Sequence, residues 1–70
     1  MEAMQTSYSI DRALAIAQAM VSGPFQAAVI AENATSYVIE AASTERAKAY
    51  MARQGGAENR HGVIKAVIFA

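Results

Sequence analysis

The run from Val63 to Phe69 has apolar side chains at both odd and even positions, and most of its residues are β-branched or aromatic. This composition is typical of a strand. Successive side chains of a strand point to opposite faces of its sheet, so both faces of this strand need cover. The run therefore predicts a sheet that is covered by helices on one face and by something else on the other.

A helix is predicted from Ile10 to Val21, where apolar residues recur every three or four positions. Ser9 is placed to accept hydrogen bonds from the first free amides of this helix, and Asp11 lies near its positive end. The sequence Ser22-Gly23-Pro24 predicts a left-handed cap, followed by a residue that cannot continue the helix. Both ends of the helix are thus specified locally.

Two strands and a second helix are expected next. The strands are predicted at Phe25–Ala31 and Tyr37–Ile39, with a hairpin turn between them in which Asn33 is expected to have a positive φ. Ser43 is a plausible N-cap for a helix that runs to the glycines at 55 and 56. A polar loop then leads to the last strand.

These elements predict one α+β domain that spans residues 1–70, with the order α-β-β-α-β and an antiparallel sheet covered by two helices on one face. A further strand at Met4–Tyr8 would complete a ferredoxin-like βαββαβ plait. Gln5, Thr6 and Ser7 are polar, whereas a central strand of a plait is expected to be apolar.

Charge and hydropathy limit the classes of partner. Six basic and six acidic residues cancel and are scattered singly, whereas proteins that bind duplex DNA usually present a basic face. We therefore expect no direct contact with nucleic acid. No apolar stretch approaches the length that spans a bilayer, and the first residues lack the features of a signal peptide. We expect a cytoplasmic protein without a membrane partner, in the host-cell cytoplasm if it is phage-encoded.

The predicted core is thin, because seventeen of the 70 residues are alanine and cysteine is absent. Small domains without disulfides or metals often gain stability by self-association. If the helices cover Ile64, Ala66 and Ile68, the alternate side chains of the last strand stay open, and an open apolar face commonly marks an interface. We therefore expect a homodimer, with an interface that includes Val63, Lys65, Val67 and Phe69.

The densest polar cluster lies in the loop before the last strand, and it contains the single histidine. Loops on a rigid scaffold often carry function, so this cluster is the candidate site for a partner protein or protein complex. Its residues are Glu58, Asn59, Arg60 and His61. We find no catalytic residues, no metal site and no cofactor-binding site, because activated nucleophiles, ligand clusters and patterned glycines are missing.

The segment SYVIEAASTERAKA, residues 36–49, resembles the strand-into-helix unit of many small phage and mobile-element proteins, including several anti-CRISPR proteins. The resemblance implies a non-enzymatic inhibitor that binds a CRISPR effector complex and blocks DNA access or nuclease recruitment. Many such inhibitors are acidic and mimic DNA, whereas this chain is neutral. The resemblance therefore implies a steric or allosteric block.

Two alternatives stay open. A dimeric ferredoxin-like domain could bind a small ligand or serve a regulatory role, with a pocket lined by Tyr37, Tyr50, Arg60 and His61. A dimeric plait could also be an enzyme that uses His61 as a general base. We expect a protein that is not an enzyme.

Overall fold

Four strands and two helices follow one another in the order β-α-β-β-α-β in the computed structural model, which describes residues 3–53 and 62–70. Their bounds are β1 (Met4–Ser7), α1 (Ile10–Ser22), β2 (Ala27–Asn33), β3 (Ser36–Ala42), α2 (Thr44–Ala52) and β4 (Val63–Phe69). The α+β class and the predicted order of elements are confirmed, including the additional first strand.

Serine caps begin both helices as predicted. The Ser9 hydroxyl oxygen accepts a hydrogen bond of 3.2 Å from the Arg12 amide, and the Ser43 hydroxyl oxygen accepts one of 3.2 Å from the Arg46 amide. At the end of α1 the amide of Gly23 bonds to the Met20 carbonyl, but Gly23 has a φ of −95°. The predicted left-handed cap is therefore wrong, and Pro24 follows a cap of another type.

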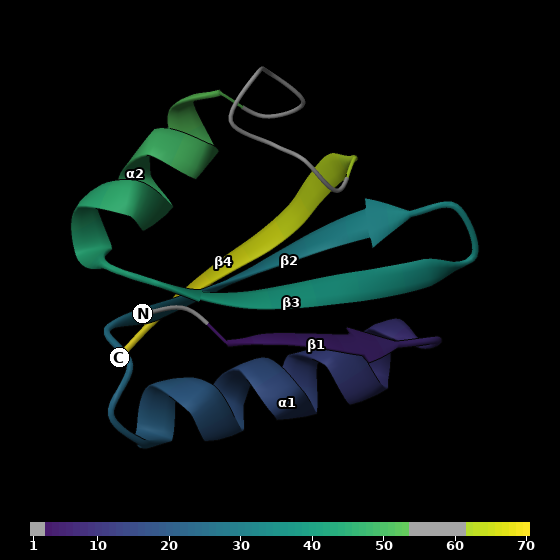
Figure 1. Cartoon of the computed structure of the whole chain (residues 1–70), viewed down its shortest axis with the longest axis horizontal. Coiled ribbons are helices and arrows are strands. Elements are labelled where there is room, and N and C mark those ends of the chain that lie inside the picture. Colours follow the sequence, from purple (N-terminus) through teal and green to yellow (C-terminus); the bar gives the residue numbers. More distant parts are fainter. Residues whose placement is uncertain (1–2, 54–61) are drawn as a thin grey trace.

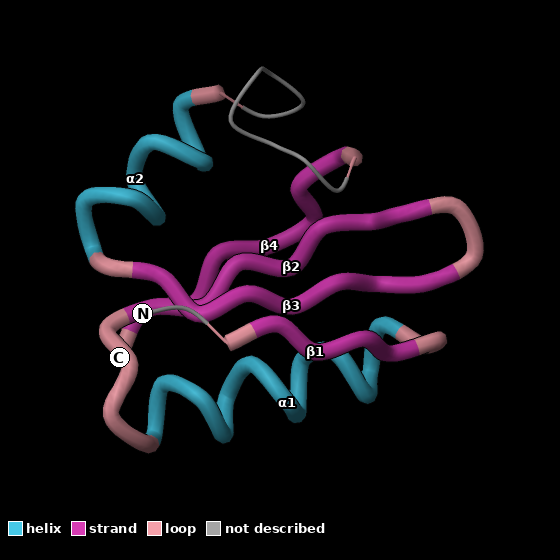
Figure 2. Tube along the Cα trace, viewed as in Figure 1, coloured by secondary structure: helices cyan, strands magenta, loops and turns pink. Residues whose placement is uncertain are grey.

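The sheet is antiparallel throughout and has the strand order β1-β3-β2-β4 (Figures 1 and 2). In a ferredoxin-like plait the last strand lies beside the first, whereas β4 here lies beside β2. The ferredoxin-like arrangement is thus wrong for this chain. β1 forms an edge of the sheet, which explains why its sequence is polar.

The two helices pack on opposite faces of the sheet, so the prediction that both cover one face is also wrong. The core cluster of α1 includes Ile30 and Ile39. The core cluster of α2 includes Val29, which is next to Ile30, and Ala42, which is three residues from Ile39. Residues of a strand that are separated by an odd number of positions point to opposite faces of the sheet. The result is three layers, with the sheet in the middle.

Connection handedness explains the three layers. Strands β1 and β2 are parallel with β3 between them, and β3 and β4 are parallel with β2 between them. Each parallel pair is joined by a crossover connection that contains one helix, α1 between β1 and β2 and α2 between β3 and β4. Both crossovers step in the same direction across the sheet, but they start from strands that point in opposite directions. Crossovers between parallel strands are right-handed in nearly all proteins. Two right-handed crossovers of this kind place their helices on opposite faces.

Small residues let the layers approach closely. Ala13 and Ala17 of α1 and Ala47 of α2 are fully buried, and every residue from Ala27 to Ala31 in β2 is buried because both faces of that strand are covered. The alanine-rich composition therefore serves a thin three-layer core. None of the helices in the described part of the chain is long and apolar enough to cross a membrane.

Candidate binding surface

The residues predicted to contact a partner, Glu58 to His61, lie outside the described residues. The proposed ligand pocket is split, because Tyr37 packs in the α1 cluster and Tyr50 in the α2 cluster, on opposite faces of the sheet. Arg60 and His61, its other two members, are also outside the described residues. Tyr37 and Tyr50 of one molecule therefore cannot line the same pocket.

The candidate dimer residues of β4 do not share one face, because the register of β4 shifts at Lys65. Ala66 pairs with Ile30 but Ile64 pairs with Ala31, so Lys65 is the extra residue of a β-bulge. Ala66 and Ile68 lie under α1 as predicted, together with Tyr37 and Ile39, whereas Ile64 packs in the α2 cluster.

The same bulge places Val63 on the α1 side, opposite Glu32, and Val67 and Phe69 on the α2 side. Val67 packs against the α2 cluster, whereas Val63 and Phe69 are 55% and 41% exposed. The expectation that these side chains form one open face is therefore wrong. Lys65 forms an ion pair of 3.0 Å with Glu32, and this carboxylate raises the pKa of Lys65.

A buried polar cluster, which was not predicted from the sequence, lies between α2 and β3. Glu40 of β3 is only 4% exposed, and its carboxylate accepts a hydrogen bond of 2.9 Å from the Tyr50 hydroxyl. Arg46 Nη2 lies 3.8 Å from the same carboxylate, and the Arg46 guanidinium lies 5.8 Å from the centre of the Tyr50 ring. The arrangement ties α2 to the sheet.

Burial of Tyr50 and its bond to Glu40 raise the pKa of the tyrosine above 10.0, while Arg46 acts in the opposite direction. Tyr50 is thus a hydrogen-bond donor at neutral pH. Arg46 and Tyr50 are one helical turn apart, a spacing that places two side chains on the same helix face. Two features of the sequence could have indicated this cluster: the acidic Glu40 lies inside a mainly apolar strand, and Arg46 and Tyr50 have the spacing of one helix face.

Within residues 3–53 and 62–70, no group of three or more acidic or histidine side chains is placed to hold a metal ion.

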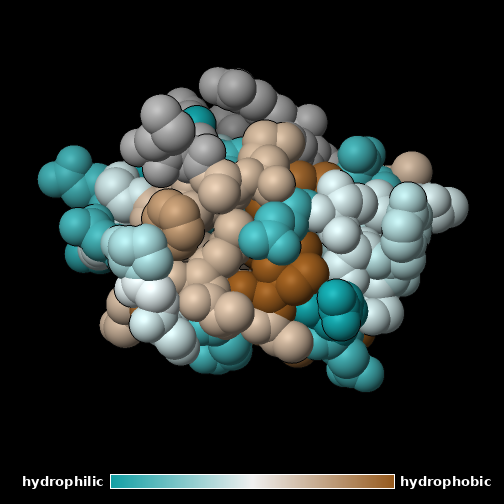
Figure 3. All heavy atoms as spheres, turned by 60° about the horizontal axis from the view of Figure 1, so that its bottom comes forward, coloured by the Kyte–Doolittle hydropathy of each residue, from teal (hydrophilic) through white to brown (hydrophobic). Residues whose placement is uncertain are grey.

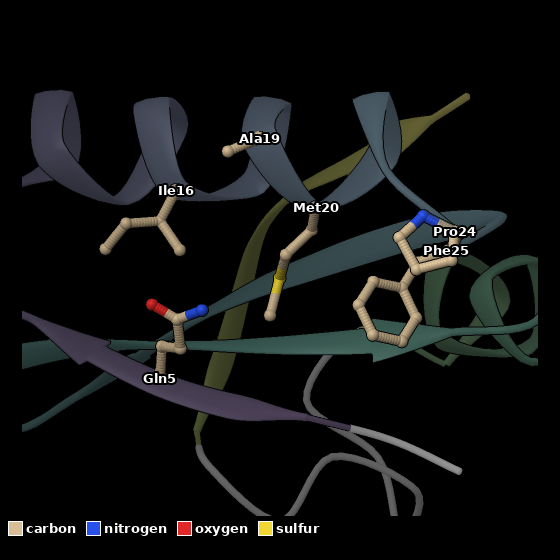
Figure 4. A pocket seen from close by; sticks show the side chains of 6 residues that line it. All are labelled: Gln5, Ile16, Ala19, Met20, Pro24 and Phe25. Carbon is tan, nitrogen blue, oxygen red and sulfur yellow. The ribbon is translucent and has the colours of Figure 1, made fainter.

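An apolar hollow of about 300 Å³ lies between α1 and β1 (Figure 4). Ile16 and Met20 point from α1 toward the sheet, Gln5 points from β1 toward α1, and Phe25 lies at the end of the hollow. Ala19 and Pro24 complete the lining. Figure 3, turned so that the lower side of Figure 1 comes forward, shows apolar surface across the middle of the molecule and hydrophilic residues at both ends. The apolar hollow contributes a concave site with mainly apolar walls.

A second hollow of about 360 Å³ lies at the other end of β1. It is lined by Thr6, Ser7, Tyr8, Ser9 and Arg12. Arg12 and Ile16 are one turn apart on α1, so one flank of this helix borders both hollows. We call the two hollows and the free edge of β1 beside them the β1–α1 groove.

The backbone of β1 is available for pairing. The amide of Ala41 bonds to the carbonyl of Ala3, which fixes Ala3, Gln5 and Ser7 as the residues whose backbone groups bond to β3. By the same alternation, the amides and carbonyls of Met4 and Thr6 point to the free edge. Among the described residues, β3 is the only strand neighbour of β1.

Fold and site together define a small three-layer α+β domain that has a free sheet edge beside an apolar hollow. No protein-family model, no curated protein and no solved structure matches this chain. The resemblance to anti-CRISPR proteins therefore stays a prediction.

Proposed function

We propose that this chain is a small, non-enzymatic protein-binding module that takes its partner at the β1–α1 groove. The observation that carries the proposal is the free edge of β1 directly beside a hollow with mainly apolar walls. Recognition sites that add a strand to a sheet combine backbone hydrogen bonds at an edge with pockets for alternate side chains. The groove supplies both elements.

The other edge of the sheet is less suited to this role. Natural proteins commonly protect edge strands with β-bulges and lysine residues, and β4 has both at Lys65. β1 pairs with β3 in regular register and contains neither lysine nor proline. Its four residues permit only a short ladder, so the hollow must contribute part of the binding energy.

Selection of short random peptides displayed on phage, with the purified protein as bait, tests this proposal. Selected peptides are expected to shift the amide resonances of Met4 and Thr6. They should lose binding to Ala19→Arg, since Ala19 is exposed and lines the apolar hollow. Gln18→Arg is the matched control, because Gln18 is exposed on the same helix, lines neither hollow and receives the same charge. A library without enriched peptides, or peptides that bind both variants equally, would refute the proposal.

The narrower proposal is that the partner is a bacterial CRISPR effector complex, which is blocked sterically or allosterically in the host cytoplasm. The resemblance of residues 36–49 supports this partner, and the neutral net charge, which argues against DNA mimicry, supports only the steric or allosteric mode of the block. Phage plating on strains with active CRISPR systems of several types tests it. Plaques should recover with the wild type and not with Ala19→Arg. If no system is inhibited, the narrower proposal fails and the general one stands on the peptide experiment.

A homodimer is a second part of the proposal, and the exposed apolar side chain of Phe69 at the edge strand β4 favours it. Val67 contributes to the α2 cluster of the same molecule and is thus less available to a partner. Association at β4 would leave the β1–α1 groove open, since the two edges lie at opposite ends of the strand order.

A further inference from the structure

We infer that the β1–α1 groove binds an extended peptide segment that carries an acidic side chain and, two residues closer to its C-terminus, a large apolar side chain. This inference rests on the proposed function, because it specifies the partner of the same groove.

The extended backbone follows from the edge of β1. Met4 and Thr6 present amides and carbonyls in the plane of the sheet, and a neighbouring strand is the structure that pairs with such alternate groups. Antiparallel pairs outnumber parallel pairs about two- to three-fold. Every existing pair in this sheet is antiparallel, so we assign the antiparallel direction to the incoming segment.

The apolar residue follows from the position of Gln5. Side chains of directly opposite residues in paired strands lie on the same face. Gln5 faces the α1 layer, since its partner Ile39 belongs to the α1 cluster, and it lines the apolar hollow. A segment residue opposite Gln5 would therefore direct its side chain between Ile16 and Phe25. A leucine-sized side chain fits the volume of about 300 Å³.

The acidic residue follows from Arg12. Ser7 faces the α1 layer as Gln5 does, and it lines the second hollow with Arg12. The guanidinium of Arg12 has no ion pair within the described ranges 3–53 and 62–70, and no acidic side chain lines either hollow. A carboxylate on the segment residue opposite Ser7 would supply the missing charge partner.

The spacing follows from strand geometry. Gln5 and Ser7 are two residues apart, or roughly 7 Å along a strand, and a paired segment has the same repeat. In the antiparallel direction the residue opposite Ser7 precedes the residue opposite Gln5. The recognised pattern is therefore acidic, any residue, large apolar. A three-residue spacing would turn one of the two side chains to the opposite face.

Four short synthetic peptides, blocked at both ends and based on threonine, test the inference. The first has glutamate and leucine in the inferred order and spacing, the second has them three residues apart, the third has lysine for glutamate, and the fourth has serine for leucine. Binding is followed by nuclear magnetic resonance titration of the labelled full chain. The first peptide should shift the amides of Met4 and Thr6. The second and fourth should bind about tenfold more weakly, because a leucine-sized side chain loses its burial.

The charge partner is tested with Arg12→Glu. This exposed variant should weaken the glutamate peptide about fivefold and strengthen the lysine peptide by a similar factor, as expected for an exposed charge pair. Equal affinity for both spacings, or no reversal of charge preference, would overturn the inference. If peptides selected from the phage library still shift the β1 amides, the proposed function survives that failure. If neither set of peptides shifts them, both proposals fall.

Discussion

The hydroxyl group of Tyr50 in α2 donates a hydrogen bond of 2.9 Å to the carboxylate of Glu40 in β3, and both residues are almost completely buried. A buried charged group is costly unless hydrogen bonds satisfy it. This pair fastens the shorter helix to a central strand, on the face of the sheet opposite α1.

Tyr50→Phe is therefore expected to lower the free energy of unfolding by about 1–3 kcal/mol, because it removes a donor from a buried carboxylate. The measurement is urea unfolding followed by circular dichroism. Tyr37→Phe is the matched control, since the Tyr37 hydroxyl has no hydrogen-bond partner in the parts of the chain that the structure describes, and it should change stability little. Equal effects of the two substitutions would show that the hydrogen bond to Glu40 contributes nothing.

Stability should also fall at alkaline pH. Burial and Glu40 raise the pKa of Tyr50 above 10.0 in the folded state, so the unfolded chain releases the phenolic proton first. The stabilisation is complete below the unfolded pKa and is lost as pH rises through the folded pKa. The ion pair with Glu32 raises the pKa of Lys65 and acts in the same direction.

Unfolding of the wild type and of Tyr50→Phe at a series of pH values from about 8 to 11 separates the two contributions. Lys65 is common to both proteins, so the steeper fall of the wild type reports Tyr50. Parallel curves would contradict the assignment.

Gly62→Ala is expected to destabilise the protein by about 2 kcal/mol or more. Gly62 has a φ of +114°, and an added Cβ would overlap the backbone carbonyl of Glu32. Gly23→Ala is the control, because its Cβ would make only ordinary contacts of 3.4 and 3.6 Å, and its effect should stay within about 0.5 kcal/mol. Thermal unfolding of both variants checks the difference. A tolerated alanine at position 62 would contradict the close approach of Gly62 to the backbone carbonyl of Glu32.

Ala34→Gly is expected to stabilise the β2–β3 hairpin. The turn consists of Ala34 and Thr35 between the paired residues Asn33 and Ser36, and Ala34 has a φ of 53°. A left-handed conformation costs a residue with a Cβ about 1–2 kcal/mol, while glycine loses more backbone entropy on folding, so the net gain should be about 0.5–1 kcal/mol. Ala31→Gly, at a buried strand position, should destabilise under the same conditions. A loss of stability in Ala34→Gly would contradict the turn geometry.

The predicted homodimer can be tested by light scattering coupled to size exclusion. A wild-type dimer that becomes a folded monomer in Phe69→Glu would support association at β4, because Phe69 is exposed on the α2 side of this edge. Val63→Glu is the control on the α1 side of the same strand. A monomeric wild type at high concentration would end the dimer proposal and leave the β1–α1 groove as the binding surface.

Local signals in the sequence predicted most of the secondary structure. The serines at positions 9 and 43 and the β-branched run of β4 act through near neighbours, so their effect does not depend on the rest of the chain. The positive φ was expected at Asn33 and occurs at Ala34, because β2 continues to Asn33, two residues beyond its predicted end, and β3 begins at Ser36, one residue before its predicted start.

The candidate site could not be derived in the same way. The β1–α1 groove brings together Gln5, which precedes α1 in the sequence, and Phe25, which follows it. The buried polar cluster brings together Glu40 of the sheet and Tyr50 of α2. The alternation of side chains sorts the residues of a strand into two faces. It does not show which of the two faces each helix covers. Glu40, for example, is buried because α2 covers its side of the sheet, and that placement comes from the tertiary structure.

The sequence by itself determined the order of elements, the helix starts and the alternation of β1, β2 and β3, since these depend on backbone geometry and on interactions within a few residues. The alternation of β4 is interrupted by the bulge at Lys65, which arises in its pairing with β2. Only the tertiary structure decided that β4 joins β2 and not β1. That single pairing places α2 on the opposite face, makes β1 a free edge and forms the hollow beside it. Pairing between strands distant in sequence depends on how all the layers bury their apolar surface at once.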